Sequence, residues 1–219
     1  MLLGQIALAF AAKRAAPKAS LGALILAALL PDLLCTVLVL AGVERVRIGA
    51  GGTAMLPIAF VWWPVSHSLL MVLVWGALAA AIYRWRTGYR IGSLVVFALV
   101  ASHWLLELLS HRSDLPLAPG LDTRVGIGLG DVPAAMIALE AALFFVGVAL
   151  YLDQTRPIRW AGRFGLLAMI AFAAIVFLAA MSGIAPRGPR ELIAVSLVTW
   201  AFVPWGAWVD RYRVVPRRA

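Results

Sequence analysis

The sequence predicts an all-α protein, a polytopic bundle of membrane helices in which residues 1–219 form a single integral membrane domain. Of the 219 residues, 63% are apolar and only 13% are charged, whereas a water-soluble domain has about 25% charged residues. Six apolar windows also reach the roughly 20 residues that a helix needs to cross the hydrocarbon of a bilayer. The predicted transmembrane helices cover residues 20–43, 66–85, 91–109, 132–152, 164–183 and 192–209.

Two further apolar segments are too short to span. Residues 2–12 are followed at once by Lys13 and Arg14, so we expect a short N-terminal interfacial or half-inserted helix. It does not read as a signal peptide, because the basic residues follow the apolar run. Residues 54–65 contain two prolines and the pair Trp62 and Trp63, which predicts a re-entrant or interfacial segment with the tryptophans at headgroup depth.

The distribution of basic residues predicts the orientation. They gather in the N-terminal segment, the second and fourth loops and the C-terminal tail (Lys13, Arg14, Lys18, Arg84, Arg86, Arg90, Arg156, Arg159, Arg163, Arg211, Arg213, Arg217 and Arg218). The positive-inside rule then places both termini in the cytoplasm. The net charge of +9 is thus a topology signal, and we expect membrane lipids but no nucleic acid as partners. The excess of arginine over lysine suits a bacterium, and we expect the inner membrane.

Three acidic residues lie inside predicted spans: Asp32, Glu107 and Glu140. An ionised carboxylate in hydrocarbon costs at least about 2.5 to 3.5 kcal/mol, so such a residue is by default a candidate for function. Asp32 follows Pro31, which removes a backbone donor and favours a polar break in the helix. The alternative is a kink whose carboxylate is satisfied by water. Glu140 is expected at a depth similar to that of His103, so the two could meet, although Glu140 could equally pair elsewhere in the bundle.

The richest polar pattern is the run from His103 to Asp114. At about 100° per residue, His103, Glu107, His111 and Asp114 share one narrow stripe of a helix. A His/Glu pair four residues apart can bind one divalent cation, whereas the alternative is a hydrogen bond that merely ties helices together. His67 lies at the outer start of the second span, so all three histidines fall on the outer side. The single cysteine, Cys35, excludes an internal disulfide.

These motifs resemble a known family. The chain has Pro31-Asp32, then Ser66-His67-Ser68-Leu69-Leu70, then Ser102-His103-Trp104-Leu105-Leu106-Glu107. This order is similar to the membrane-bound metal-dependent hydrolase family, which has a Pro-Asp pair, a His-Ser-Leu segment and a His-x-x-Leu-Asp segment and is distantly similar to zinc-dependent phospholipase C. The continuation to His111-Arg112-Ser113-Asp114-Leu115-Pro116-Leu117 resembles small bacterial membrane proteins that end this stretch in nearly the same way.

The resemblance implies that Asp32, His67, His103 and Glu107 are metal ligands, with His111 and Asp114 as further ligands or acid/base groups. This chain departs from the family pattern at two positions. Gln5 stands where family members have a histidine, which puts one metal position in doubt, and Glu107 replaces the usual aspartate.

Three functions follow from these residues. The first is a hydrolase with a divalent metal, most simply zinc given histidine and carboxylate ligands, that activates water against a phosphoester or ester of a lipid or lipid-linked substrate. Glu107, Asp114 and Glu140 are then the candidate catalytic acids, which orient the water or protonate the leaving group. The second is a proton- or cation-coupled transporter or permease, and the third is a non-catalytic membrane scaffold.

Overall fold

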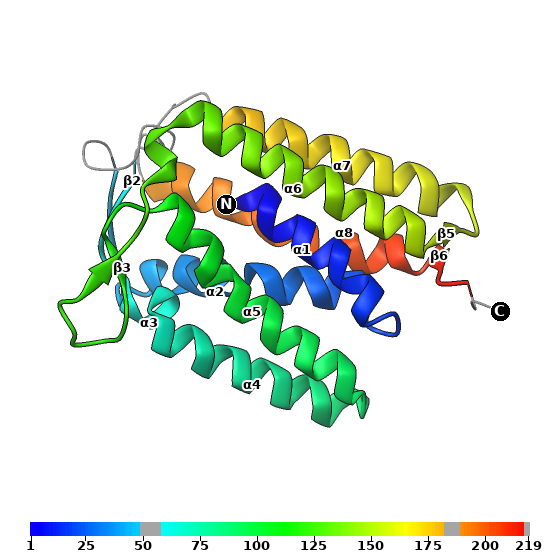
Figure 1. The fold of residues 1–219 in the computed structure, drawn as a ribbon, viewed down its shortest axis with the longest axis horizontal. Helices are drawn as coiled ribbons and strands as arrows, with labels where there is room; N and C mark the ends of the chain where they lie inside the picture. The colour runs from blue at the N-terminus through cyan, green and yellow to red at the C-terminus, as the bar shows by residue number, and fades with distance from the viewer. Residues whose placement is uncertain (49–57, 182–188, 217–219) are drawn as a thin grey trace.

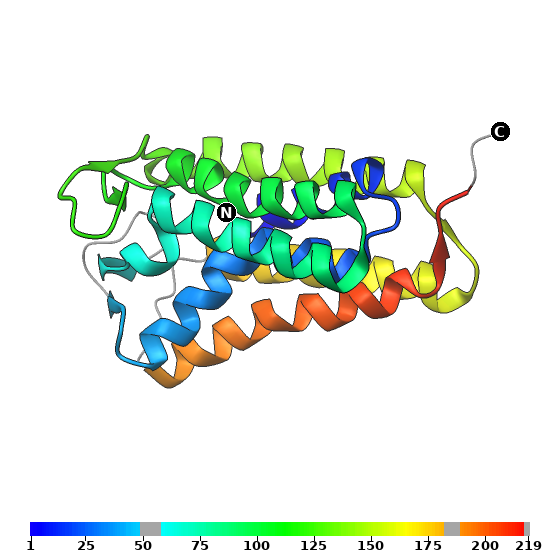
Figure 2. The ribbon, with the colours of Figure 1, turned by 90° about the horizontal axis from the view of Figure 1, so that it is seen from below.

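The computed structural model describes residues 1–48, 58–181 and 189–216, and these residues form eight α-helices with three short hairpins. Most of the helices run lengthwise, side by side (Figures 1 and 2). The helices are α1 (Leu2–Ala15), α2 (Leu21–Leu40), α3 (Pro64–His67), α4 (Leu69–Thr87), α5 (Arg90–Ser110), α6 (Pro133–Gln154), α7 (Trp160–Met181) and α8 (Pro189–Asp210). The antiparallel hairpins pair β1 (Arg45–Ile48) with β2 (Ile58–Trp62), β3 (Leu115–Pro116) with β4 (Arg124–Val125), and β5 (Arg156–Pro157) with β6 (Arg213–Val214). A 3-10 turn, η1 (Leu129–Asp131), precedes α6.

Five of the described helices, α2, α4, α5, α6 and α7, are long and apolar enough to cross a membrane. Large apolar side chains on them face outward, among them Leu78 and Ile82 on α4 and Phe145 on α6, which is 76% exposed. A soluble protein rarely exposes so much contiguous apolar surface. The helical membrane class predicted from the sequence is therefore supported. The sixth predicted span, residues 192–209, lies within α8, which is not one of these five helices.

Local sequence signals explain where the spanning helices begin and end. The side chain of Ser20 accepts from the amide of Ala23 at the start of α2, and Ser68 accepts from Met71 at the start of α4. Both are ordinary N-caps, which satisfy an amide that the helix leaves unpaired. Gly88, with φ of +68°, ends α4 in the left-handed conformation that glycine adopts without strain. Pro31 does not break α2, which continues to Leu40.

The N-terminal helix α1 corrects one sequence prediction. It does not lie on the surface of the bundle, as an interfacial helix would, but is enclosed by α6, α2 and α5 (Figure 1). Leu3, Ile6 and Phe10 are at most 3% exposed, and a helix that is apolar on every side belongs in a core. Close approach to α6 depends on Gly147, because a Cβ there would lie 2.4 Å from the carbonyl oxygen of Ala7.

Only part of the predicted re-entrant segment, residues 54–65, is described, because residues 54–57 lie outside the described residues. From Ile58 it forms strand β2 and then enters α3. Trp62 is 43% exposed, but Trp63 is buried and its ring stacks on that of Phe60 at 4.3 Å. The hairpin and Trp63 thus cover one end of the bundle.

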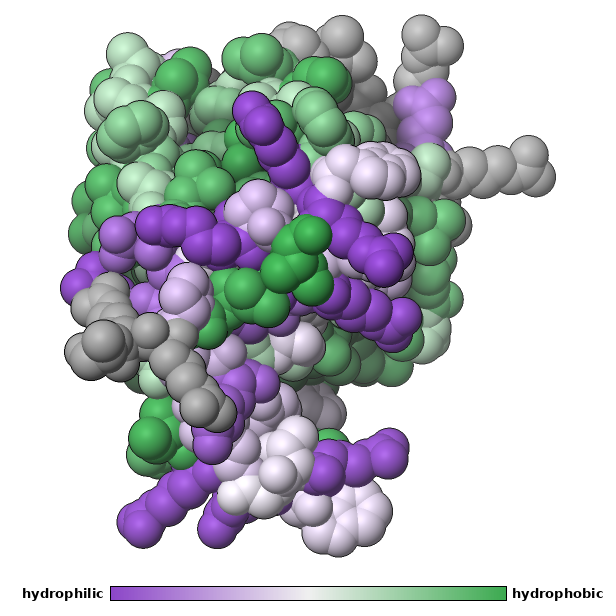
Figure 3. Space-filling view, turned by 90° about the vertical axis from the view of Figure 1, so that its right-hand side faces the viewer, coloured by the Kyte–Doolittle hydropathy of each residue, from purple (hydrophilic) through white to green (hydrophobic). Residues whose placement is uncertain are grey.

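The opposite end carries the basic loops. Exposed arginines and lysines gather there with the exposed Trp85 and Trp160 (Figure 3). Beneath them lies a buried ion pair, in which Lys13 Nζ contacts Asp210 Oδ2 at 2.7 Å. The other carboxylate oxygen of Asp210 accepts from the hydroxyl of Tyr151 at 3.1 Å. This contact set joins α1, α6 and α8 at the basic end, whereas the histidines lie at the other.

Candidate metal centre

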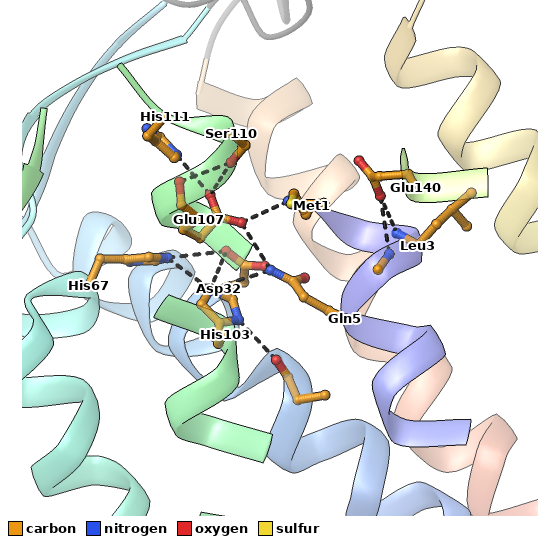
Figure 4. A network of polar contacts seen from close by, with 12 residues as sticks. Met1, Leu3, Gln5, Asp32, His67, His103, Glu107, Ser110, His111 and Glu140 are labelled. Atoms are coloured by element: carbon orange, nitrogen blue, oxygen red, sulfur yellow. Dashed lines mark hydrogen bonds and ion pairs between the residues drawn. The ribbon is translucent and has the colours of Figure 1, made fainter. Parts of the chain in front are cut away.

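Three side chains from three helices meet at the end of the bundle that the β1–β2 hairpin covers (Figure 4). Asp32 lies on α2, His67 is the last residue of α3 and His103 lies on α5. Asp32 Oδ1 is 3.3 Å from His67 Nε2 and 3.7 Å from His103 Nε2, and the two Nε2 atoms are 3.4 Å apart. We call these residues the triad. Sequence reasoning expected all three at one site, and the structure brings them together.

Second contacts of each imidazole indicate which ring nitrogen carries its proton. His103 Nδ1 lies 2.9 Å from the carbonyl oxygen of Ala28, which can only accept, so Nδ1 carries the hydrogen. His67 Nδ1 lies 2.7 Å from Ser66 Oγ, and that hydroxyl lies 2.6 Å from Glu44 Oε2. The hydroxyl donates to the carboxylate and accepts from Nδ1–H. In the neutral form of both rings, Nε2 therefore presents a lone pair to the triad.

This arrangement fits a divalent cation. Two imidazole lone pairs and a carboxylate oxygen face one another, and these three acceptors include no donor that would join them by hydrogen bonds. In a tetrahedral zinc site with bonds of about 2.0–2.1 Å, neighbouring ligand atoms lie about 3.4 Å apart, close to the three measured separations. The carbonyl of Ala28 behind His103 is also the usual outer support of a histidine ligand, and behind His67 the Ser66 hydroxyl connects the ring to the Glu44 carboxylate.

Glu44 and Ser66 are functional candidates that sequence reasoning missed. Glu44 lies just after the first predicted span, yet it is 2% exposed and accepts from both the amide and the hydroxyl of Ser66. The cap of α4 is Ser68, whereas the hydroxyl of Ser66 faces His67. The one sequence signal for Ser66 was its place beside His67. Nothing local pointed to Glu44, because its partner lies 22 residues along the chain.

Glu107 lies beside the triad but not in it. Its Oε1 accepts from Gln5 Nε2 at 3.1 Å and from the amino group of Met1 at 2.7 Å. Its Oε2 lies 2.8 Å from His111 Nε2 and 3.2 Å from the hydroxyl of Ser110. Four hydrogen bonds satisfy this buried carboxylate without a metal. The structure therefore supports a place for Glu107 at the edge of the site.

His111 links Glu107 to Asp114, which lies 3.0 Å from the imidazole Nδ1. The predicted helical stripe ends earlier than expected, since α5 stops at Ser110 and His111 has extended backbone. Burial disfavours the charged imidazole, but the hydrogen bonds to Asp114 and Glu107 outweigh it and raise the pKa of His111 to about 9. With both ring nitrogens donating to carboxylates, His111 has no lone pair for a metal in this arrangement.

Gln5 reaches the site from α1. Its side-chain nitrogen lies 3.4 Å from His103 Nε2 in addition to its contact with Glu107. Gln5 is 1% exposed, and its Oε1 is buried without a hydrogen-bond partner among the described residues. Leaving such an acceptor unpaired costs about 1 to 3 kcal/mol. The position that sequence reasoning identified as a departure from the family pattern is therefore part of the site.

Glu140 takes a different place. Its Oε2 accepts from the backbone amides of Leu3 and Gly4 at 2.7 and 3.2 Å, in the first turn of α1. Figure 4 shows it on the side of α1 away from the triad. A carboxylate at a helix N-terminus satisfies amides that have no partner within the helix. The structure thus does not bring Glu140 to His103, and its evident role is to hold α1 in place.

Comparison with known proteins finds no family model, no curated protein and no solved structure that matches this chain. The relation to the membrane-bound metal-dependent hydrolase family therefore stays a prediction from the sequence motifs.

Proposed function

We propose that the protein is a metal-dependent membrane hydrolase whose triad holds one divalent cation, most simply zinc. The observation that supports this best is the convergence of three acceptor atoms, Asp32 Oδ1, His67 Nε2 and His103 Nε2, at the spacing of metal ligands. Zinc bound by three protein ligands supplies Lewis acidity and brings the pKa of water toward 7. A phosphoester or ester is the substrate class that such chemistry serves.

The acidic residues around the triad and His111 have separate roles in this proposal. Glu107 is a buried carboxylate linked to His103 of the triad through Gln5, and we assign it to orient the attacking water, which would replace one of its four donors. His111 holds Glu107 from behind, and the partly exposed Asp114 holds His111. This chain of contacts runs from the site toward the surface. Asp114 is accordingly the second candidate acid, whereas Glu140 supports the first turn of α1.

A lipid or lipid-linked substrate is favoured by an apolar groove of about 320 Å³ between α1 and α5. The groove runs from Ala15 and Val95 to Leu8 and Ser102, about 10 Å along each helix. Ser102 precedes His103, and its hydroxyl donates a hydrogen bond to the carbonyl oxygen of Leu99. The groove therefore offers apolar contacts that begin beside the site and extend toward the basic end of the bundle.

We further propose that α8 is the sixth span, that the membrane is a bacterial inner membrane, and that both termini are cytoplasmic. Support comes from the gathering of basic side chains at the end opposite to the triad. In this orientation the triad lies in the outer half of the membrane, facing the periplasm.

The test is metal content and hydrolysis measured on the same purified protein. We expect stoichiometric zinc in the wild type, loss of that zinc in His103→Ala, and cleavage of a soluble nitrophenyl phosphodiester only by the loaded protein. Ala98→Phe, which fills the groove, should slow hydrolysis of a long-chain phospholipid but spare the soluble ester. Leu94→Phe, outside the groove on the same helix, is its control. Metal-free protein that supports pH-driven flux in liposomes would favour transport instead.

A further inference from the structure

The side-chain amide of Gln5 lies against the triad, and both of its polar partners, His103 and Glu107, belong to the candidate site. Its Nε2 contacts His103 Nε2 at 3.4 Å and Glu107 Oε1 at 3.1 Å, whereas its Oε1 has no hydrogen-bond partner in the part of the chain that the structure describes. Its buried neighbours on α1, Leu3 and Ile6, are apolar. An apolar side chain at position 5 would avoid the unpaired oxygen. Compared with an apolar residue, glutamine at position 5 therefore adds the contacts of its amide nitrogen with His103 and Glu107.

An amide nitrogen does not bind a metal, because its lone pair is delocalised into the carbonyl and the group acts as a donor. In the observed orientation Gln5 donates to Glu107 and contributes no ligand atom. Asp32, His67 and His103 then make a three-ligand site, the number typical of a catalytic zinc that keeps one position for an exchangeable ligand. Four protein ligands would make a closed site of the structural kind.

We propose that Gln5 is a positioning residue that holds the Glu107 carboxylate beside the triad and leaves the fourth coordination position to an exchangeable ligand. This inference rests on the proposed function. Gln5 acts through Glu107, whose Oε1 also accepts from the amino group of Met1 at 2.7 Å and whose Oε2 is held by Ser110 and His111. With both oxygens engaged, the carboxylate has one orientation beside the triad.

Two substitutions separate a positioning role from a ligand role. Gln5→Leu keeps the approximate volume and removes the donor. We expect its Co²⁺ affinity to stay within about threefold of the wild type, since the three ligands remain. Hydrolysis of the soluble phosphodiester should lose kcat by about tenfold or more with little change in KM, because Glu107 loses the one of its four donors that also contacts the triad.

Gln5→His places an imidazole Nε2 as many bonds from the backbone as the amide nitrogen it replaces. A fourth ligand should raise Co²⁺ affinity about tenfold or more and close the site. Added phosphate should alter the visible Co²⁺ spectrum of the wild type and of Gln5→Leu, but not that of Gln5→His. Lys18→His, at the basic end, controls for an extra imidazole elsewhere.

The outcomes distinguish this inference from the function on which it rests. A wild type that binds no cation would overturn both. If the wild type binds Co²⁺ and Gln5→Leu binds it more than about tenfold more weakly, Gln5 is a ligand and the inference is wrong. The same conclusion follows if Gln5→Leu keeps its kcat, or if Gln5→His binds Co²⁺ and still responds to phosphate. Should Gln5→His fail to fold, the affinity and kcat of Gln5→Leu decide the question.

Discussion

Removing the hydroxyl of Ser66 should weaken metal binding without touching a ligand. Ser66 is fully buried, and its Oγ lies 2.7 Å from His67 Nδ1 and 2.6 Å from Glu44 Oε2. In Ser66→Ala, the Nδ1–H of His67 loses its acceptor, and the ring is no longer held with Nε2 toward the triad. Glu44 keeps the Ser66 amide at 2.8 Å but loses the hydroxyl donor.

Loss of an outer-shell partner of a histidine ligand typically lowers metal affinity 10- to 100-fold, or about 1.4 to 2.8 kcal/mol. We expect Ser66→Ala to fall in this range, measured by competition with a chromogenic chelator for zinc. Because the imidazole N–H is left unpaired, we also expect the free energy of unfolding of the metal-free variant to fall by about 1 to 3 kcal/mol. Denaturant unfolding measures this loss.

Ser68→Ala is the matched control two residues away. Ser68 is equally buried, but its hydroxyl caps α4 at Met71 and does not contact the triad. Its loss should cost about 1 kcal/mol of stability and leave zinc affinity unchanged. If Ser66→Ala binds zinc as tightly as Ser68→Ala does, the outer-shell reasoning fails, and with it the assignment of the His67 tautomer.

Two further predictions concern the bundle and its orientation. Gly147→Ala should lower thermal stability, because its Cβ would lie 2.4 Å from the carbonyl oxygen of Ala7. Gly76→Ala would meet the side chains of Phe97 at 3.2 Å and Val100 at 3.4 Å and no backbone, so it should change stability little. Equal melting temperatures would contradict this packing. In a cysteine-free background, an impermeant thiol reagent applied to intact cells should label a cysteine at Arg124 but not one at Lys18, and the reverse pattern would refute the proposed orientation.

The helices of membrane-spanning length were predictable because the signal is local. A segment that crosses hydrocarbon must satisfy its backbone internally and present apolar side chains, so composition over about 20 residues identifies it. Single residues mark the observed ends, since Ser20 caps α2 and Gly88 ends α4 beyond the predicted limit at residue 85. For α1 this reading failed, because a helix of 14 residues that is enclosed by others has the same apolar composition as one lying at an interface.

The candidate site was predictable only in part. Asp32 was identified because a carboxylate in an apolar span is costly, His103 by the polar stripe it begins, and His67 by the resemblance. Glu44 and Glu140 could not be placed in the same way, since a loop acid and an intramembrane acid reveal their partners only after the chain has folded. Glu44 supports His67 through Ser66, and Glu140 caps α1, although the sequence suggested a site role for Glu140.

The sequence by itself therefore determined that the chain is helical, that its surface suits hydrocarbon, and which residue types are too polar to lie there without a purpose. Only the tertiary structure decided which polar atoms meet. It placed Gln5 of a buried α1 beside His103 and Glu107, and it stopped α5 at Ser110 so that His111 bridges two carboxylates. Hydropathy is a property of each segment alone, whereas a metal site depends on separations of a few ångströms between segments distant in the chain.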